Sequence, residues 1–479
     1  MESIRPKVVR SGLWSLGGNW FSRVLGIIKM IILARLLSPL DFGIIGLAIL
    51  SINALNVFSE TGIESALIQR DKIGRPELDT AWTIAIIRGL VLFILLFLSA
   101  GWIASYFDNM TLKPVLRAMS ATFLLGGFTN IGIVYFQKEL NFKKKVILDS
   151  AADIAGAVSA VFLAFYIRNV WALVTGTIVW VMVKCLASYR LHPYRPKIRW
   201  DWPVAKKLLN FGKHILWITL VTFIVTSGDD VLVGKLLGLT MLGLYTMAYN
   251  IANVPVSSLT GIIGRISFPA YSILQKDPER LKEAFRKIFE TVLIVLLPLT
   301  VLIILLARDF TSIFLGDKWL PIVPVLQILC LLGLFRGLAN VFSPIQLAVN
   351  RPAIQSRNKT LELILFLALL YPFTTKWGLI GAAWAVTLVY FTSAIVNALS
   401  SASLMSPFLR ILLKASWTPL LATFGLMLST WLVQSCLKTM GGLFQFMMAG
   451  ISGFVVFGLI ILTLRKNLLR DIWTGALEQ

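Results

Sequence analysis

The sequence is poor in charged residues, cysteine and histidine, and each shortage excludes a class of protein. Only 14% of the 479 residues are charged, against about a quarter in soluble proteins, which argues against an ordinary soluble chain. The three cysteines lie far apart, so neither a disulfide framework nor a metal-binding spacing is predicted. The two histidines, His192 and His214, are interpreted as polar residues at the membrane interface. We therefore expect no metal and no cofactor.

Long polar segments are also missing. No predicted connection exceeds about 20 residues, which leaves no room for a soluble catalytic domain. A phosphate-binding glycine loop is not found either. The sequence therefore predicts no catalytic residues and a protein that is not an enzyme.

The sequence is instead rich in long hydrophobic segments. Of its residues, 57% are hydrophobic, and the mean hydropathy is +0.81. Crossing the hydrocarbon core of a bilayer takes about 20 apolar residues. The sequence predicts an all-α polytopic membrane protein with about fourteen transmembrane helices. The candidate runs are 11–34, 42–68, 79–106, 112–136, 146–167, 169–190, 208–234, 242–270, 288–307, 321–348, 360–375, 378–404, 411–433 and 443–464.

The positive charge follows the predicted topology. A net charge of +22 is typical of nucleic-acid binding in a soluble protein, but cytoplasmic loops of membrane proteins also collect Lys and Arg. With the N-terminus inside, thirty of the 45 Lys and Arg residues fall in inner segments and nine in outer ones. We therefore predict a multi-pass protein of the inner or plasma membrane, with both termini cytoplasmic, that binds membrane lipids and no nucleic acid.

The chain repeats itself at an offset of 200 residues. The stretch from Lys29 to Gly43 returns as the stretch from Asp229 to Gly243. The residue pairs Leu36/Leu236, Leu37/Leu237 and Gly43/Gly243 are identical. In each copy the stretch reads as the outer end of one helix, a tight connection and the start of the next. Two parallel six-helix repeats, with a site between them, are expected. The predicted parts are an N-lobe at 1–190, a basic linker at 191–207, a C-lobe at 208–404, and two further helices with a cytoplasmic tail at 405–479.

Charged residues inside the predicted spans are candidates for a transport site, because each costs about 2.5–3.5 kcal/mol at the centre of a bilayer. They either line a cavity or form structural ion pairs. Lys184, Asp149 and Glu362 lie near the inner boundary, where they can reach water. The deeper candidates are Arg23, Lys29, Arg336, Asp229 and Asp230, followed by Arg88, Glu60 and Arg265 in the inner third.

The second predicted span carries a polar stripe. Its members are three or four residues apart, which places them on one face of a helix. The repeat has a matching stripe that includes Asn253 and Ser257. The two stripes favour a hydrophilic cleft over simple interhelical hydrogen bonds. The first stripe consists of Asn53, Asn56, Glu60 and Glu64.

Several short motifs are distributed along the chain, at 34–43, 66–70, 136–142, 171–173, 244–250, 268–271, 277–279 and 316–321. In sequence, order and spacing they resemble the motifs of the Wzx-type polysaccharide flippases, near the colanic-acid and teichuronic-acid exporter branch. That family belongs to the superfamily of the MATE exporters and the MurJ peptidoglycan-precursor flippases. The motifs are specific for the family and not for a substrate.

The resemblance implies two lobes around a central cavity, and movement of an undecaprenyl-pyrophosphate-linked oligosaccharide to the outer leaflet by alternating access. Such a protein serves polysaccharide biosynthesis, and its partners would include a polymerase and glycosyltransferases. The anionic pyrophosphate needs cations, and arginine can hold phosphate through two hydrogen bonds. Asp229 matches an acidic position common in the family, whereas Asp230 stands where asparagine is expected. The predicted substrate-binding cations are Arg23, Lys29, Arg88, Arg265 and Arg336, and the predicted polar or coupling residues are Asn53, Glu60, Glu64, Asp229, Asp230 and Asn253.

Two other functions stay open at this stage. A MATE-like multidrug or cation antiporter would need acidic residues for organic cations, and the deep charges are nearly balanced. A membrane glycosyltransferase or polymerase is disfavoured by the short outer loops. Lys29 and Asp229 occupy equivalent positions of the repeat, so they either pair across an outer gate or each face a local partner.

Overall fold

The computed structural model describes residues 4–59, 62–63, 67–68, 74–139, 141–402, 407–437 and 442–464. Within these ranges, the side chains of residues 4–10, 13, 207–218, 258–266 and 352 are not described. The predicted site residues Glu60 and Glu64 lie outside the described residues, and so does the side chain of Arg265. The side chain of His214 is not described either.

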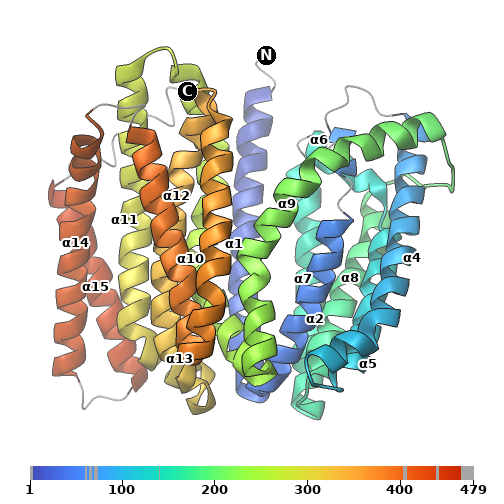
Figure 1. The fold of residues 1–479 in the computed structure, drawn as a ribbon, viewed down its shortest axis with the longest axis horizontal. Coiled ribbons are helices and arrows are strands. Elements are labelled where there is room, and N and C mark those ends of the chain that lie inside the picture. Colours follow the sequence, from blue (N-terminus) through green and yellow to red (C-terminus); the bar gives the residue numbers. More distant parts are fainter. Residues whose placement is uncertain are drawn as a thin grey trace. The chain divides into compact units, whose positions relative to one another are not determined.

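The described residues form helices and no strand, and the chain divides into two compact units, Met1–Gly243 and Leu244–Gln479. Figure 1 shows long helices that run alongside one another in each unit. The first unit holds α1 (Ile4–Leu36), α2 (Pro39–Phe58), α4 (Arg75–Tyr106), α5 (Leu112–Gly127), η1 (Ile131–Ile133), α6 (Val134–Lys138), α7 (Phe142–Ile167), α8 (Trp171–Leu191), α9 (Trp202–Leu237) and the first turn of α10 (Leu239–Leu274). The second unit holds the rest of α10, α11 (Pro278–Phe310), η2 (Thr311–Leu315), η3 (Asp317–Ile322), α12 (Val323–Ala348), α13 (Pro352–Ala402), α14 (Phe408–Cys436) and α15 (Gly442–Leu464).

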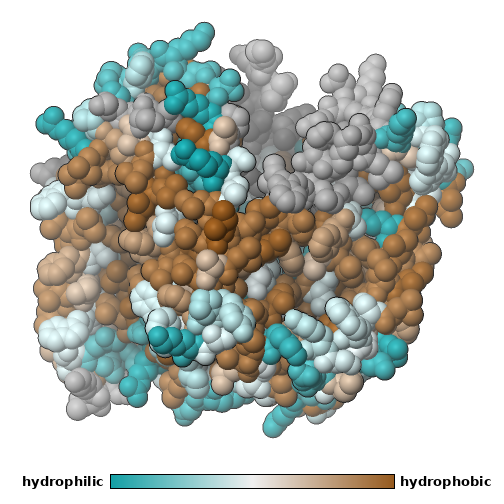
Figure 2. All heavy atoms as spheres, viewed as in Figure 1, coloured by the Kyte–Doolittle hydropathy of each residue, from teal (hydrophilic) through white to brown (hydrophobic). Residues whose placement is uncertain are grey.

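The predicted class, an all-α polytopic membrane protein, is confirmed. Among the described residues, ten helices are long and apolar enough to cross a membrane, and α5 with α6, bent by 67°, makes an eleventh if the pair is one span. Figure 2 shows hydrophobic residues over the middle of the helices and hydrophilic residues at both ends. A count of fourteen requires in addition that α9 and α10 each cross once and that α13 crosses on both sides of Gly378, where its backbone leaves the helical region (φ 59°, ψ −137°). That count stays a prediction.

The connection between α1 and α2 follows from its sequence. Ser38 caps α2: its hydroxyl accepts the backbone N–H of Asp41, and the Asp41 carboxylate accepts the backbone N–H of Ser38 at 2.9 Å. Pro39 at the first helical position prevents continuation from α1 and is preorganised for α2. In the repeat, Gly238 adopts a positive φ of 87° between α9 and α10. The predicted sequence of helix end, tight connection and helix start is therefore confirmed in both copies.

The first turns of α2 and α10 meet at repeat-related glycines. A Cβ placed on Gly43 would lie 1.7 Å from the carbonyl oxygen of Leu239, and a Cβ on Gly243 would lie 1.8 Å from that of Pro39. Pro39 and Leu239 are themselves 200 residues apart, so the two contacts are equivalent under the repeat. The backbones therefore touch directly, which only glycine at these two positions allows.

Small residues also set the packing of α7 on α8. A Cβ added to Gly156 would lie 2.9 Å from the carbonyl oxygen of Gly176, and one added to Gly176 would lie 2.8 Å from that of Gly156. Close approach of two helices through small residues is common in membranes. The contact fixes the rotation of both helices, and with it the direction of the polar side chains on their facing sides.

The segment that follows α8 is held against α4. Asp79 of α4, which is buried, accepts the hydroxyl of Tyr194 and the backbone N–H of Lys197, the latter at 2.9 Å. The backbone N–H of Arg199 donates to the Thr83 hydroxyl at 3.0 Å. This basic segment belongs to the predicted linker 191–207. The lobe boundaries predicted from the repeat stay a prediction, because the compact units are divided at a different place.

In the second unit, the core is rich in aromatic residues. Phe285 and Phe289 of α11 pack against Phe342 of α12, with ring centroids 5.7 and 6.0 Å apart. Burying rings of this size contributes strongly to packing between helices. The core holds the first part of α11 against the last part of α12, which leads into α13.

Candidate functional site

A cavity of about 660 Å³ lies in the first unit, among α2, α4, α5, α6, α7 and α8. Its volume is in the range of small-molecule sites, about 300–1,000 Å³. Uncharged polar groups, among them Asn53, Asn56, Thr122, Thr177 and Gln137, are distributed over its wall. Charged side chains also line it, and these are Arg88, Lys145, Asp149 and Lys184.

Arg88 extends from α4 toward the polar stripe of α2. Its guanidinium donates to the Ser59 hydroxyl at 2.9 Å and to the Asn56 side-chain oxygen at 3.0 Å. Next to it, a Cβ on Gly89 would lie only 2.5 Å from the carbonyl oxygen of Phe123, so α4 and α5 also approach closely here. Both Arg88 and Asn53 line the cavity, so the structure brings these two predicted site residues together.

Two acidic residues of α7 meet two residues of α8 in register. The Lys184 ammonium lies 3.0 Å from the Asp149 carboxylate, and both side chains are about one third exposed. One turn further along α7, the Asp153 carboxylate accepts the Trp180 indole N–H at 2.8 Å. The Lys184 ammonium also lies 4.9 Å from the centre of the Trp180 ring. Because the charged pair is about one third exposed and lines the cavity, its cation stays available to a bound anion.

A second cavity of about 220 Å³ contains Lys29 of α1. Lys29 shares this cavity with Asp153, and Asp153 also accepts the Ser22 hydroxyl at 2.5 Å. Thr177 and Trp180 line both cavities, so the two are adjacent. The structure therefore places Lys29 in a cavity with a local acid. Its pairing with Asp229 stays a prediction.

Together, the described walls of the two cavities carry more positive than negative charge. The bases are Lys29, Arg88, Lys145 and Lys184, and the acids are Asp149 and Asp153. In the low-dielectric interior of a membrane protein, this excess favours an anion over a cation. The residues that the structure describes include no cluster of three metal-binding side chains.

In the second unit, Arg336 and Asn253 lie in contact. The Arg336 guanidinium, on α12, donates to the Tyr249 hydroxyl at 2.7 Å and to the Asn253 side-chain oxygen, both on α10. The rings of Tyr249 and Tyr390 lie 5.9 and 5.8 Å from the guanidinium carbon. In each unit, therefore, an arginine is held by an asparagine of the predicted polar stripe, Arg88 by Asn56 and Arg336 by Asn253.

The remaining predicted residues are separate from this arrangement. Arg23 lies half-buried on α1, outside the walls of the two cavities. Asp229 is buried and Asp230 half-buried on α9. The coupling role predicted for them stays a prediction.

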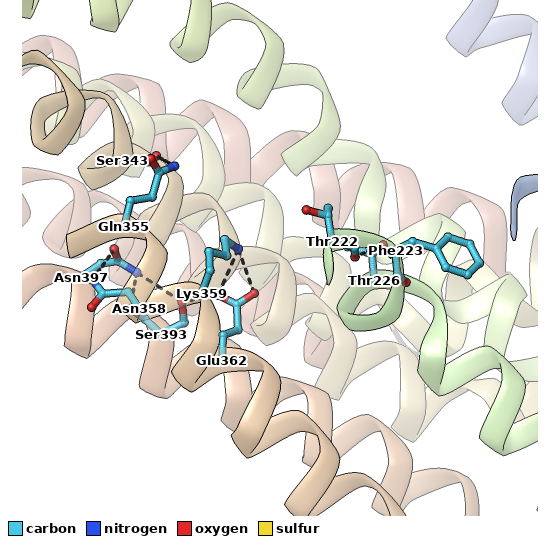
Figure 3. Close-up of polar contacts among 10 residues, drawn as sticks. All are labelled: Thr222, Phe223, Thr226, Ser343, Gln355, Asn358, Lys359, Glu362, Ser393 and Asn397. Carbon is cyan, nitrogen blue, oxygen red and sulfur yellow. Dashed lines mark hydrogen bonds and ion pairs between the residues drawn. The ribbon is translucent and has the colours of Figure 1, made fainter. Parts of the chain in front are cut away.

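A buried polar network joins the two halves of α13, on either side of Gly378, and is not among the predicted sites. Figure 3 shows Glu362 with Lys359 and Ser393, and Asn358 with Asn397. The Glu362 carboxylate is only 2% exposed and accepts the Lys359 ammonium at 2.9 Å and the Ser393 hydroxyl at 2.8 Å. Asn358 donates to the Asn397 oxygen at 3.1 Å. The sequence does contain a signal for it, because Asn358 and Glu362, like Ser393 and Asn397, are four residues apart.

Comparison with known proteins identifies the family. Residues 32–324, more than half of the chain, match the family model described as "Polysaccharide biosynthesis protein". The chain belongs to this family. The protein is 28% identical over 401 residues to the lipopolysaccharide biosynthesis protein WzxC of Escherichia coli K12, covering 83% of this chain and 81% of WzxC. It is 23% identical to the teichuronic acid biosynthesis protein TuaB of Bacillus subtilis 168, covering 88% and 87% of the two chains.

Solved structures support the fold. The lipid II flippase MurJ, in an inward closed conformation, superposes with a TM-score of 0.72 at 16% identity, covering 95% of this chain and 99% of MurJ. At this identity the likeness establishes the fold alone. Together with the family match, it confirms the resemblance to polysaccharide flippases drawn from the sequence motifs.

Proposed function

We propose that this protein moves a lipid-pyrophosphate-linked oligosaccharide from the inner to the outer leaflet of the cell membrane, by alternating access. The observation that carries the proposal is the cavity of the first unit, whose wall combines an excess of basic residues with many uncharged polar groups. The cations suit a pyrophosphate, and the amides and hydroxyls suit a glycan. The relatives WzxC and TuaB, named for polysaccharide biosynthesis, support this assignment.

The charge of the substrate also suits the direction of transport. A membrane potential that is negative inside favours outward movement of an anion, by about 2.3 kcal/mol per charge per 100 mV. A cation exporter would gain nothing from this term and would have to carry its substrate past Arg88 and Lys184. The protein's own role is then to bind, enclose and release, with no chemical step and no catalytic residue.

Topology gives the cavity a direction. We take both termini as cytoplasmic, since the predicted inner connections hold most of the Lys and Arg residues. Lys145 and Asp149 near the start of α7, and Lys184 near the end of α8, then lie toward the cytoplasm. The contact between Gly43 and Gly243 lies toward the outside. On this assignment, the contact closes the outer end while the cavity receives substrate from the inner leaflet.

The lobes and partners belong to the same proposal. Residues 1–190 and 208–404 would move against each other as the two repeats, with 191–207 as the linker and 405–479 outside the repeat. A polymerase and glycosyltransferases of the same polysaccharide would supply and consume the lipid-linked glycan.

Export in cells tests the proposal. In a strain that makes the polysaccharide and lacks this gene, the wild-type gene should restore surface polysaccharide. Arg88→Gln with Lys184→Gln should reduce export at least tenfold, because each lost charge-assisted hydrogen bond is worth about 1.5–3 kcal/mol. Lys276→Gln, on the connection between α10 and α11, removes one positive charge outside the cavity and is the control for a nonspecific charge effect. Normal export by the double variant at equal membrane abundance would exclude this cavity as the anion site.

A further inference from the structure

Trp180 occupies an unusual position for a membrane tryptophan. It is the tenth of the 21 residues of α8, near the middle of the helix, whereas tryptophan normally gathers at the two interfaces. Its side chain is partly buried. Trp180 lines both cavities, so it faces them. Packing alone does not require an aromatic ring at such a place.

The indole ring is held in one orientation. Its N–H donates to the Asp153 carboxylate at 2.8 Å, and Asp153 is itself held by the Ser22 hydroxyl at 2.5 Å. At the base of the side chain, a Cβ added to Gly156 would lie 2.9 Å from the Trp180 Cβ, so α7 leaves the tryptophan no room to move toward it. A ring fixed in this way is a rigid surface that loses little entropy when a ligand packs on it.

The groups around the ring match the chemistry of a sugar. A pyranose has an apolar face of C–H groups and a rim of hydroxyls. Trp180 provides an aromatic ring, with the Lys184 ammonium 4.9 Å from its centre, while Thr177, Asn53 and Asn56 in the same cavity provide hydroxyl and amide partners. Arg88 and Lys184 provide cations for the phosphates in that cavity. An aromatic ring between polar groups and cations therefore suits a glycosylated pyrophosphate better than a bare one.

We propose that Trp180 is the stacking platform for a sugar ring of the transported lipid, and thus a specificity-determining residue for the glycan. The inference rests on the proposed function and goes one step further, because it assigns sugar recognition to a single side chain. Asp153 is a positioning residue that acts through the indole. Loss of the ring should remove the part of the affinity that the sugar contributes.

Binding to the full-length protein in lipid nanodiscs tests the proposal. Two probes are compared: a short-chain polyprenyl pyrophosphate without sugar, and the same lipid carrying one hexose or N-acetylhexosamine. The wild type should bind the glycosylated probe roughly tenfold more tightly, as expected for one aromatic stacking contact. Trp180→Leu should lose this difference, so that the two probes bind equally. Trp171→Leu, the same substitution at the exposed start of α8, should keep the difference.

The outcomes separate the two proposals. Equal binding of both probes by the wild type, or a tenfold difference that survives in Trp180→Leu, would overturn the platform and leave the flippase proposal standing. Binding of neither probe by the wild type would overturn the proposed function and the platform with it. Trp180→Phe keeps a ring without the N–H, so it should retain part of the difference.

Discussion

The glycine contact between α2 and α10 gives the sharpest prediction about conformational change. A methyl group at Gly43 would lie 1.7 Å from the Leu239 oxygen, whereas ordinary van der Waals contact begins at 3.4 Å. The obstacle is backbone and not a flexible side chain, so the two helices must separate by about 1.7 Å to admit it. Gly43→Ala should therefore weaken the closed contact without disturbing α2 itself, because alanine favours helix more than glycine does.

The magnitude follows from the cost of overpacking. Forcing extra atoms into a tight contact costs about 1–3 kcal/mol, which corresponds to a fall of roughly 5- to 150-fold in the population of the closed contact relative to an open one. Gly243→Ala meets the Pro39 oxygen at 1.8 Å and should have the same effect. Gly17→Ala on α1, where nothing lies within 4 Å of the added Cβ, is the matched control.

Cysteine labelling measures this population. In a protein whose native cysteines Cys185, Cys330 and Cys436 are replaced, Asn53→Cys places a thiol on the cavity wall. A membrane-impermeant maleimide added from outside should label this thiol faster in both the Gly43→Ala and the Gly243→Ala variants, and unchanged in Gly17→Ala. Outside labelling at the control rate in both glycine variants, with the protein folded and in the membrane, would refute the idea that this contact closes the outer end.

Three further predictions concern the second unit and the linker. Arg336→Gln should lower the free energy of unfolding by about 1.5–3 kcal/mol, because the charge-assisted hydrogen bond to Asn253 is lost. A thermal unfolding midpoint equal to that of the wild type would contradict this prediction. Asp79→Ala should release the linker, since the Tyr194 hydroxyl and the backbone N–H of Lys197 lose their acceptor. Tryptic cleavage after Lys197 and Arg199 should then accelerate at least fivefold, and cleavage at the wild-type rate would contradict the docking. Burial lowers the pKa of His192 below its ordinary 6.5, so the docked linker holds the neutral imidazole, and docking should be complete well above pH 6.5 and weaken as the pH falls below it. Protection of the linker amides, measured against their intrinsic exchange rate at each pH, should fall with it, and protection that stays constant through that range would exclude the effect.

Local signals in the sequence predict much of the fold. The serine and proline before α2 and the glycine before α10 determine where helices begin, and such signals act within a few residues. The offset of 200 residues pairs Gly43 with Gly243 on the sequence alone. Repeat symmetry does not predict that the two glycines touch, because that depends on how two helices approach in space.

The site is only partly predictable for the same reason. The polar stripe of α2 indicates which face meets water, but it cannot show that Arg88 reaches Asn56 from another helix. The repeat relates Lys29 to Asp229, while the acid that shares its cavity, Asp153, lies one hundred and twenty-four residues away in sequence. One usable signal is present: spacings of four residues on both α7 and α8 are what two antiparallel helices need to form paired contacts in register.

Transport by the purified protein tests the central claim most directly. Proteoliposomes containing a fluorescent lipid-pyrophosphate-linked oligosaccharide, probed with a membrane-impermeant quencher, report its movement between leaflets. The account predicts movement that requires the protein, accelerates with a potential that drives anions in the transport direction, and is lost in Arg88→Gln with Lys184→Gln but not in Lys276→Gln. Folded wild-type protein that leaves the labelled lipid in its original leaflet, or that instead moves cationic dyes against protons, would contradict it.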